Sequence, residues 1–166
     1  DFSYYISVHR MMESRLKEMG LDVESSSIDE FYADFRGTYS EAKSILSGYS
    51  SWVESSLGIT VSAGIAPTRM LAKLASEIVK PSGLSVLLPE ELPEALDSFA
   101  VGRLLGIGKA TSSFLHLAGI RTLGQLRSAP KEVLGQMGLD SRINVAGLNE
   151  DNVERVARLV APHLAG

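Results

Sequence analysis

The sequence of 166 residues contains no cysteine and only three histidines. The absence of cysteine excludes disulfides, thiolate metal centres and cysteine nucleophiles, and it agrees with a reducing compartment. His9, His116 and His163 are far apart and share no metal-ligand spacing, so we interpret them as structural or surface residues. No serine or threonine has the histidine and acid neighbours that would make it a nucleophile.

Long apolar runs are also missing. No stretch approaches the roughly 18 residues of a membrane span, and the amino terminus lacks a basic-then-apolar export pattern. The cytoplasm is therefore the expected location. A hydrophobic content of 45% supplies enough apolar material for a globular core. The chain opens at Asp1 rather than Met, which fits a piece of a longer protein.

Acidic and basic residues are distributed unevenly along the chain. The net charge of −4 argues against a general nucleic-acid binder. Residues 1–95 hold 8 basic and 14 acidic side chains, whereas residues 96–166 hold 8 and 6. Between residues 98 and 131 there is no acid, and the basic residues there are Arg103, Lys109, Arg121, Arg127 and Lys131. This basic stretch predicts a local contact with a polyanion.

Hydrophobic periodicity predicts an α+β fold for the first part of the chain. Three- and four-residue spacings indicate helices, and alternating or β-branched runs indicate strands. The predicted helices cover residues 3–19, 39–57, 69–79 and 89–99, and the predicted strands cover residues 21–24, 25–36, 59–65 and 84–88. This order suits a sandwich in which helices pack on one mostly antiparallel sheet.

An adjacent acid pair, Asp29 and Glu30, follows three serines and leads into a strand with alternating aromatic residues. Like charges held close together repel, so the pair needs a compensating cation or hydrogen-bond donors. A hard divalent cation such as Mg²⁺ is one solution, and solvation in a turn is the alternative. A regular strand directs neighbouring side chains to opposite faces, so a shared cation requires a bend here.

Two glycines and a lysine mark a second candidate site. Residues 101–118 predict a helix, a glycine hairpin at Leu105-Gly106-Ile107-Gly108-Lys109, and a second helix. The inward residues predicted for this second helix are Ala110, Phe114, Leu117 and Ala118. A tight turn exposes backbone N–H groups at a helix start, which suit a phosphate together with Lys109. An ordinary helix–helix turn is the alternative, and the acid-free surroundings favour phosphate binding.

Three further cations are candidates, and a final helix is predicted. Lys80 precedes a Pro-Ser-Gly turn from which it could reach a ligand phosphate, although helix ends favour lysine for dipole reasons alone. Arg69 and Lys73 lie one helical turn apart and form a cationic edge, which is also typical of exposed helix faces. Residues 150–164 predict a helix with Val153, Val156, Leu159 and Val160 as its apolar stripe.

Taken together, these segments resemble the Y-family (translesion) DNA polymerases of the DNA polymerase IV type. Ser27-Ile28-Asp29-Glu30 resembles the family's Ser-Ile-Asp-Glu palm motif, and residues 60–83 resemble its second palm block. Residues 105–120 resemble the helix-hairpin-helix of the thumb. Residues 146–153 faintly echo the stretch that ends the thumb.

The resemblance implies a partial, ferredoxin-like polymerase palm at residues 1–98 and a small all-α helix-hairpin-helix thumb at residues 99–166. It implies template-directed nucleotidyl transfer by a two-Mg²⁺ mechanism in DNA damage bypass and repair. Asp29 and Glu30 would ligate the metal and act in catalysis, in a hairpin bend. Lys80 would contact the incoming nucleotide. The residues assigned to DNA binding are Gly106, Ile107, Gly108, Lys109, Arg69 and Lys73.

Departures from the family pattern limit this expectation. The family begins with a strand that carries another metal-binding aspartate, and no residue before Asp1 supplies it here. Within these 166 residues the resemblance gives no counterpart of the family's fingers or little finger. We therefore expect the chain alone to be inactive or weakly active. The expected partners are primer–template DNA, deoxynucleoside triphosphates, and a sliding clamp or a chain that supplies the missing palm strand.

Two alternatives remain open from the sequence. A non-catalytic Y-family relative that binds DNA as an accessory protein agrees with the missing aspartate, although a scaffold has no need of the acid pair. A nucleotide cyclase-like enzyme shares a related palm with paired acids, but the basic glycine hairpin would have no role in it. DNA binding at physiological salt separates the first alternative from the second.

Overall fold

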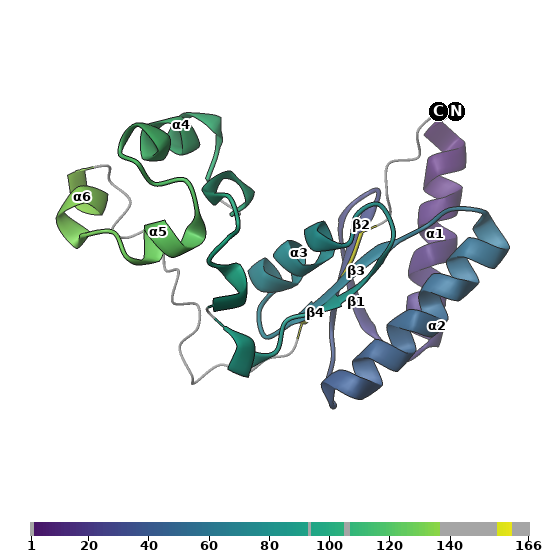
Figure 1. The fold of residues 1–166 in the computed structure, drawn as a ribbon. Coiled ribbons are helices and arrows are strands. Elements are labelled where there is room, and N and C mark those ends of the chain that lie inside the picture. Colours follow the sequence, from purple (N-terminus) through teal and green to yellow (C-terminus); the bar gives the residue numbers. More distant parts are fainter. Residues whose placement is uncertain (1, 93, 105–106, 137–155, 161–166) are drawn as a thin grey trace. The chain divides into compact units, whose positions relative to one another are not determined.

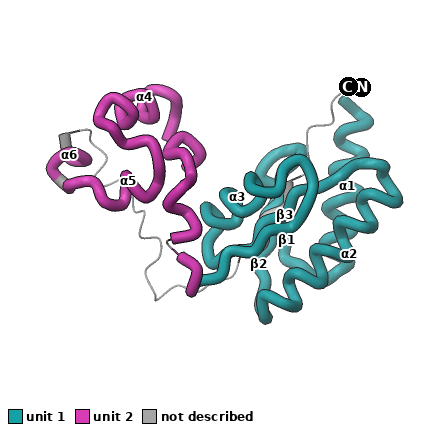
Figure 2. Tube along the Cα trace, viewed as in Figure 1, with its two compact units in different colours: residues 1–89, 153–166 teal, residues 90–152 magenta. Residues whose placement is uncertain are grey.

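The computed structural model describes residues 2–92, 94–104, 107–136 and 156–160 (Figure 1). The chain divides into two compact units (Figure 2). Unit 1 comprises Asp1–Pro89 and Val153–Gly166, and unit 2 comprises Glu90–Asn152. The boundary expected after residue 98 lies further along the chain than this division.

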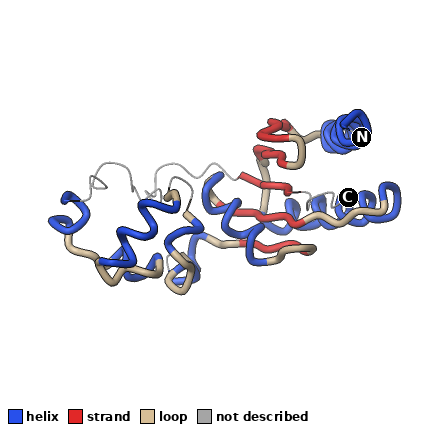
Figure 3. Tube along the Cα trace, turned by 90° about the horizontal axis from the view of Figure 1, so that it is seen from above, coloured by secondary structure: helices blue, strands red, loops and turns tan. Residues whose placement is uncertain are grey.

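A mostly antiparallel five-stranded sheet forms the centre of unit 1 (Figure 3). Its strands are β1 (Asp22–Ser27), β2 (Glu30–Asp34), β3 (Ser62–Ala66), β4 (Gly83–Val86) and β5 (Val156–Val160). The spatial order is β1-β2-β5-β3-β4, and only the β3–β4 pair is parallel. The predicted mixture of helices and strands is confirmed.

One face of this sheet carries α1 (Phe2–Glu18) and α2 (Tyr39–Leu57), which pack against each other. Their apolar stripes follow the predicted spacing. The buried core on this face consists of Val8, Met12, Leu16, Leu21, Phe31, Ala33, Ala42, Leu46, Tyr49, Val53, Val61, Ala63 and Ile65. At the start of α2, Thr38 and Glu41 form a reciprocal capping box, and Gly58 ends the helix in the left-handed conformation.

The opposite face carries α3 (Arg69–Ile78), which begins after the N-cap Thr68. Gly64 on β3 permits its close approach, because a Cβ atom there would lie 2.1 Å from the carbonyl oxygen of Ala72. The apolar spacing of residues 69–79 predicts that Leu71, Leu74, Ala75 and Ile78 point inward, and the first three are buried. Ile78 was predicted to point inward and is instead 48% exposed, because it is the final residue of the helix.

The largest correction concerns the end of the chain. The predicted helix over residues 150–164 is wrong for residues 156–160, which form β5. This strand pairs with both β2 and β3, so each of its edges has a hydrogen-bonding neighbour. Periodicity cannot separate a short apolar strand from a helix, and the Val-Ala-Arg-Leu-Val segment satisfies both patterns. The remaining residues of the predicted helix lie outside the described residues.

Unit 2 consists of short helices and turns. The 3₁₀ turns are η1 (Pro89–Glu91), η2 (Glu94–Leu96) and η3 (Val101–Arg103), and the α-helices are α4 (Lys109–Leu117), α5 (Leu123–Arg127) and α6 (Lys131–Gln136). The predicted helix over residues 89–99 is therefore replaced in part by η1 and η2. The helix predicted before the glycine hairpin is only the three-residue turn η3, because the chain leaves the helical conformation at Leu104.

The orientation predicted for α4 is also wrong. Phe114 and Leu117 are 62% and 87% exposed, and Ala110 and Ala118 are exposed as well. Leu115 is the buried residue of this helix, with 0% exposure. Helix α4 has nine residues with apolar side chains on more than one face, so its apolar spacing fits two orientations. The predicted orientation places inward the side chains that the structure exposes. Among the described residues, no helix is long and apolar enough to cross a membrane.

Candidate functional site

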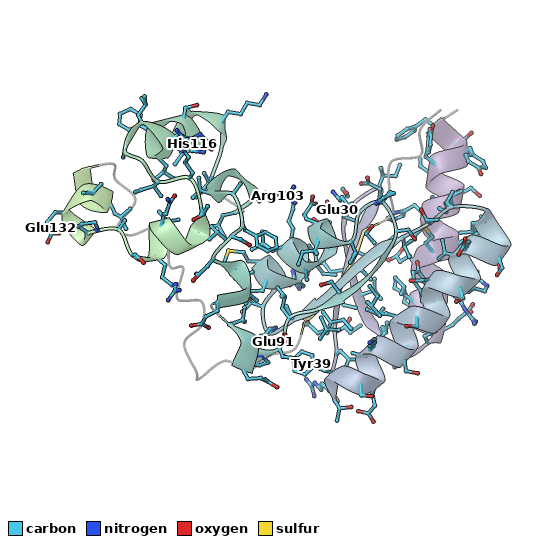
Figure 4. The ribbon with its side chains drawn as sticks, viewed as in Figure 1. Glu30, Tyr39, Glu91, Arg103, His116 and Glu132 are labelled. Carbon is cyan, nitrogen blue, oxygen red and sulfur yellow. The ribbon has the colours of Figure 1, made fainter. Side chains whose placement is uncertain are left out.

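The acid pair lies at a tight hairpin bend between β1 and β2. Ser27 pairs with Glu30, so Ile28 and Asp29 form the two-residue turn, and Glu30 is the first residue of β2 (Figure 4). Both carboxylate residues are half-buried. A bulge between Ser25 and Ser27 adds local curvature just before the turn. The bend that a shared cation requires is therefore present.

Serine side chains shape this turn. The Ser27 hydroxyl donates to Asp29 Oδ1 at 2.7 Å, and the Ser25 hydroxyl donates to the Ser27 carbonyl oxygen at 3.1 Å. The first bond orients one oxygen of the Asp29 carboxylate. Small hydroxyl residues form such local bonds because their side chains reach nearby backbone and carboxylate groups. The serine run that precedes the acids thus has a structural reason.

His9 of α1 contacts the same hairpin from the side. Its Nδ1 lies 2.8 Å from the Ile28 carbonyl oxygen, and its Nε2 lies 3.3 Å from the Ser25 hydroxyl oxygen. The imidazole also stacks on Phe31, with ring centroids 4.7 Å apart and an interplanar angle of 23°. Sequence reasoning placed His9 among structural or surface residues and did not connect it to the acid pair.

Glu30 and the turn that contains Lys80 lie at the same end of the strands of the sheet. Glu30 pairs with Val160, Val160 pairs with Ser62, and Ser62 pairs with Gly83. Strand neighbours lie about 4.8 Å apart, so the Cα atoms of Glu30 and Gly83 are about 14 Å apart across three spacings. The order of the strands therefore brings the acid pair and the Lys80 turn to the same end of the sheet.

Both groups also lie on the α3 side of the sheet. Phe31 faces the core beneath α1 and α2, so the alternating neighbours Glu30 and Tyr32 face the other way. Lys80 follows the end of α3 on that side. The two candidate groups thus lie at the same end and on the same face of the sheet, which sequence spacing alone could not establish.

Hydroxyl groups of the β3 region hold the Lys80 turn. The Thr60 hydroxyl donates to the Pro81 carbonyl oxygen at 3.4 Å, and the Ser62 hydroxyl donates to the Val79 carbonyl oxygen at 3.5 Å. Lys80 lies between these two anchored residues. Its Nζ is 2.5 Å from Glu77 Oε1, and the Lys80 side chain is exposed whereas that of Glu77 is half-buried. The predicted phosphate-binding cation therefore has an intramolecular partner.

Arg69 is engaged inside unit 1. Its Nη2 lies 2.6 Å from Glu24 Oε2, and its guanidinium carbon is 5.2 Å from the centroid of the Tyr32 ring. The hydrogen bond from Arg69 lowers the pKa of Glu24 below its usual value of 4.5. Lys73, one turn further along α3, is half-buried. The predicted cationic edge therefore consists of one paired and one partly covered cation.

The glycine hairpin is described only in part. Gly106 lies outside the described residues. Ile107 is buried at 8% exposure, and Gly108 is the N-cap of α4 without a side-chain cap. Lys109 is exposed at the first position of this helix. Backbone donors at a helix start without a side-chain cap, next to a lysine, are an arrangement that suits an anion, and the predicted phosphate contact stays a prediction.

The carboxylates of Asp29 and Glu30 suit one hard cation. Mg²⁺ is commonly held by one or two carboxylates and completed by substrate phosphates and waters. Asp29 and Glu30 supply two half-buried carboxylates at the β1–β2 bend. In the part of the chain that the structure describes, no group of three or more acidic, histidine or cysteine residues gathers as a larger metal cluster. The described residues therefore fit a cation held jointly with a ligand rather than a complete protein cage.

Several known proteins resemble this chain. The impB/mucB/samB family matches residues 1–77. DNA polymerase IV of Methanoculleus marisnigri is 37% identical over 141 residues, which covers 83% of this chain and 39% of the relative. DNA polymerase IV 1 of Bacillus subtilis is 35% identical over 139 residues, which covers 82% of this chain and 34% of the relative. The chain belongs to the Y-family of DNA polymerases.

Solved structures of this Y-family share the fold of the chain. DinB from Sulfolobus solfataricus gives a TM-score of 0.79 at 23% identity and covers 93% of this chain and 47% of the DinB chain. An insertion ternary complex of Dbh DNA polymerase gives a TM-score of 0.78 at 24% identity and covers 93% and 46%. The chain thus spans less than half the length of the Y-family proteins that it matches.

Proposed function

We propose that this chain supplies most of the palm and the thumb of a translesion DNA polymerase of the DNA polymerase IV type. Unit 1 would be part of a ferredoxin-like palm, and unit 2 would be the thumb. The reaction would be template-directed nucleotidyl transfer in DNA damage bypass, in the cytoplasm. The substrates would be primer–template DNA and deoxynucleoside triphosphates.

The observation that carries this proposal is the placement of two groups of opposite charge. The turn with Asp29 and Glu30 and the turn with Lys80 lie at the same end and on the same face of the sheet. A triphosphate needs carboxylates that hold its cation and a lysine that contacts its oxygens. A separation of about three strand spacings leaves room for such a ligand between them.

Each charged group has a defined part in the proposed chemistry. Mg²⁺, when bound, neutralises the triphosphate and lowers the pKa of the attacking 3′-hydroxyl. Asp29 and Glu30 would hold it, and the Ser27 hydroxyl would keep the Asp29 carboxylate oriented. Lys80 would exchange its Glu77 partner for the triphosphate. Both side chains of this pair remain accessible to water, and such a surface ion pair contributes little free energy, so this exchange costs little.

The thumb would hold DNA through its glycine hairpin. Gly108 leaves backbone donors at the start of α4 open to a phosphate, Lys109 adds a positive charge, and buried Ile107 anchors the loop. Gly106, Arg69 and Lys73 complete the proposed set of DNA contacts. Because Arg69 already pairs with Glu24, its contribution would require that ion pair to open. A sliding clamp is a further proposed partner.

The chain alone is expected to be inactive or weakly active. Two-metal transfer needs more carboxylate ligands than the acid pair supplies. The strand β5, which lies between β2 and β3, contains no acidic residue in its Val-Ala-Arg-Leu-Val sequence. A further carboxylate would therefore come from another segment or from a partner chain.

Primer extension with Mg²⁺ and four deoxynucleoside triphosphates tests the proposal directly. The chain is compared with Glu30→Ala, and binding to primer–template DNA is followed as a function of salt. We expect little or no extension, any residual extension to disappear in Glu30→Ala, and DNA binding to weaken with salt and with Lys109→Ala. Absence of both extension and DNA binding would overturn the proposal.

A non-catalytic accessory role is the second candidate. It is favoured by the absence of a third acid near the pair among the described residues. It predicts that DNA binding persists while nucleotide binding is unaffected by Asp29→Ala or Glu30→Ala. If either variant weakens Mg²⁺-dependent nucleotide binding, the acid pair serves the proposed transfer site and the accessory reading fails.

A further inference from the structure

We infer that His9 is a positioning residue for the acid pair: its imidazole fixes the β1–β2 turn that carries Asp29 and Glu30. This inference rests on the proposed function for its consequence, namely cation binding. The contact itself rests on geometry alone. The imidazole touches all three parts of the hairpin, namely Ser25 on β1, Ile28 in the turn and Phe31 on β2.

The strongest of the three contacts is a hydrogen bond of defined direction. A carbonyl oxygen can only accept, so the 2.8 Å contact requires a proton on His9 Nδ1 that is donated to Ile28. The Ile28 carbonyl belongs to the peptide group that precedes Asp29. Holding this carbonyl fixes the plane of the Ile28–Asp29 peptide, because a peptide unit is rigid. The orientation of the Asp29 backbone follows from it.

The remaining contacts hold the ring in place. Stacking on Phe31 at 4.7 Å sets the plane of the imidazole and ties it to a side chain that is completely buried. The Ser25 hydroxyl oxygen lies 3.3 Å from Nε2, and its single proton is donated to the Ser27 carbonyl oxygen. Ser27 in turn donates to Asp29. A chain of short contacts therefore leads from the imidazole to the Asp29 carboxylate by a second route.

A second feature explains why the turn needs an external support. The hairpin end is exposed: Ser25, Ser26, Ser27 and Ile28 are all solvent-accessible, and the β1 ladder is interrupted by the bulge before the turn. Two adjacent carboxylates repel each other and oppose a single compact geometry. Contacts from the buried stripe of α1, where Val8 and Met12 are anchored on either side of His9, supply a rigid reference. Partners that orient metal ligands in this way strengthen cation binding.

The test uses variants that separate the ring from its N–H group. His9→Phe keeps the aromatic stacking on Phe31 and removes both nitrogens, and His9→Leu keeps only apolar contact. His9→Asn retains a donor near the position of Nδ1. His116→Ala removes an exposed histidine from unit 2 and is the matched control. Thermal unfolding of every variant shows whether the fold is kept.

Two measurements follow on each variant. Mn²⁺ binding, monitored by the electron paramagnetic resonance signal of the free ion, is expected to weaken about tenfold in His9→Phe and His9→Leu, and to stay near the original value in His9→Asn and His116→Ala. In the metal-free protein, the NMR amide resonances of Asp29 and Glu30 are expected to shift or broaden in the first two variants only.

The outcomes separate this inference from the proposed function. Unchanged turn resonances in folded His9→Phe and His9→Leu would overturn the positioning role, whatever the metal affinity. Shifted turn resonances support it even if the original protein takes up no Mn²⁺. Failure of Glu30→Ala to weaken Mn²⁺ binding would overturn the acid pair as a cation site and leave the role of His9 in the turn supported.

Discussion

Lys80 and Glu77 form an ion pair across one turn at the end of α3, with 2.5 Å between Nζ and Oε1. The pair places a carboxylate on the cation that would contact a triphosphate. Glu77 therefore competes with the ligand for the same ammonium group. The competition is weak, because both side chains retain contact with water.

Removal of this competitor is expected to strengthen nucleotide binding. In Glu77→Gln, the affinity for a deoxynucleoside triphosphate with Mg²⁺ should rise about two- to fivefold, the range of an exposed ion pair. Isothermal titration calorimetry measures the dissociation constant. Glu54→Gln, which removes the same charge from an exposed position on α2, is the control. An equal rise in both variants would indicate a general charge effect and contradict a specific role of Glu77.

The Arg69–Glu24 pair predicts the titration of one carboxyl group. Its hydrogen bond lowers the pKa of Glu24, so the ionised form favours the folded state. The stabilisation is therefore present above the unfolded pKa of Glu24 and is lost as the pH falls through the folded value. NMR titration should show the pKa of Glu24 returning toward 4.5 in Arg69→Gln. Lys73→Gln should leave it unchanged, and a similar rise in that variant would contradict a direct contact.

Gly64 is expected to be intolerant of a side chain. In Gly64→Ala, the new Cβ would lie 2.1 Å from the Ala72 carbonyl oxygen and 2.5 Å from the Ser76 backbone nitrogen. Displacement of α3 should lower the free energy of unfolding by about 3 kcal/mol or more. Urea denaturation followed by circular dichroism measures this change.

Gly48→Ala is the matched control for that substitution. Gly48 lies inside α2, and apart from its chain neighbours and the nearby backbone of α2 itself, no atom lies within 4 Å of its Cβ position. The free energy of unfolding should rise by about 0.5–1 kcal/mol, because alanine is the better helix former. Similar losses for both variants would contradict the close approach of α3 at Gly64.

The orientation of α4 can be tested with two leucines of one helix. Leu115→Ala should lower the stability of unit 2 by about 2–5 kcal/mol, because it removes a completely buried side chain. Leu117→Ala should change stability by about 0.5 kcal/mol or less, because this side chain is 87% exposed. Hydrogen exchange of unit 2 amides reports both values. The reverse order would restore the orientation predicted from periodicity.

Sequence reasoning succeeded where local signals agreed with each other. The residues of α2 were predicted from 39 to 57, since its apolar spacing and the terminating Gly58 mark the same helix, and the structure gives Tyr39–Leu57. The strand after the acid pair was also predicted, because aromatic alternation is a strong signal. The bend at Asp29 was an expectation from the family resemblance, and strand register confirms it.

The failures occurred where tertiary contacts decide between two patterns. Residues 156–160 suit a strand or a helix, and their position between β2 and β3 decides for the strand. α5 was not predicted, although Thr122 and Gln125 form a capping box that marks its start. The position of Glu30 and Lys80 at the same end of the sheet depends on strand order, which no local pattern encodes.

The position of β5 has a consequence for the order of folding. The β1–β2 hairpin and the β3–β4 pair have no hydrogen bonds with each other in the described sheet, since β5 lies between them. During synthesis on the ribosome, residues 156–160 emerge after both halves, so the two inner edges of β2 and β3 remain open until then. Open edges attract other strands. The two facing edges of β2 and β3 are therefore exposed to pairing with other strands until β5 is in place, and the two charged turns come into register only when β5 joins the two halves.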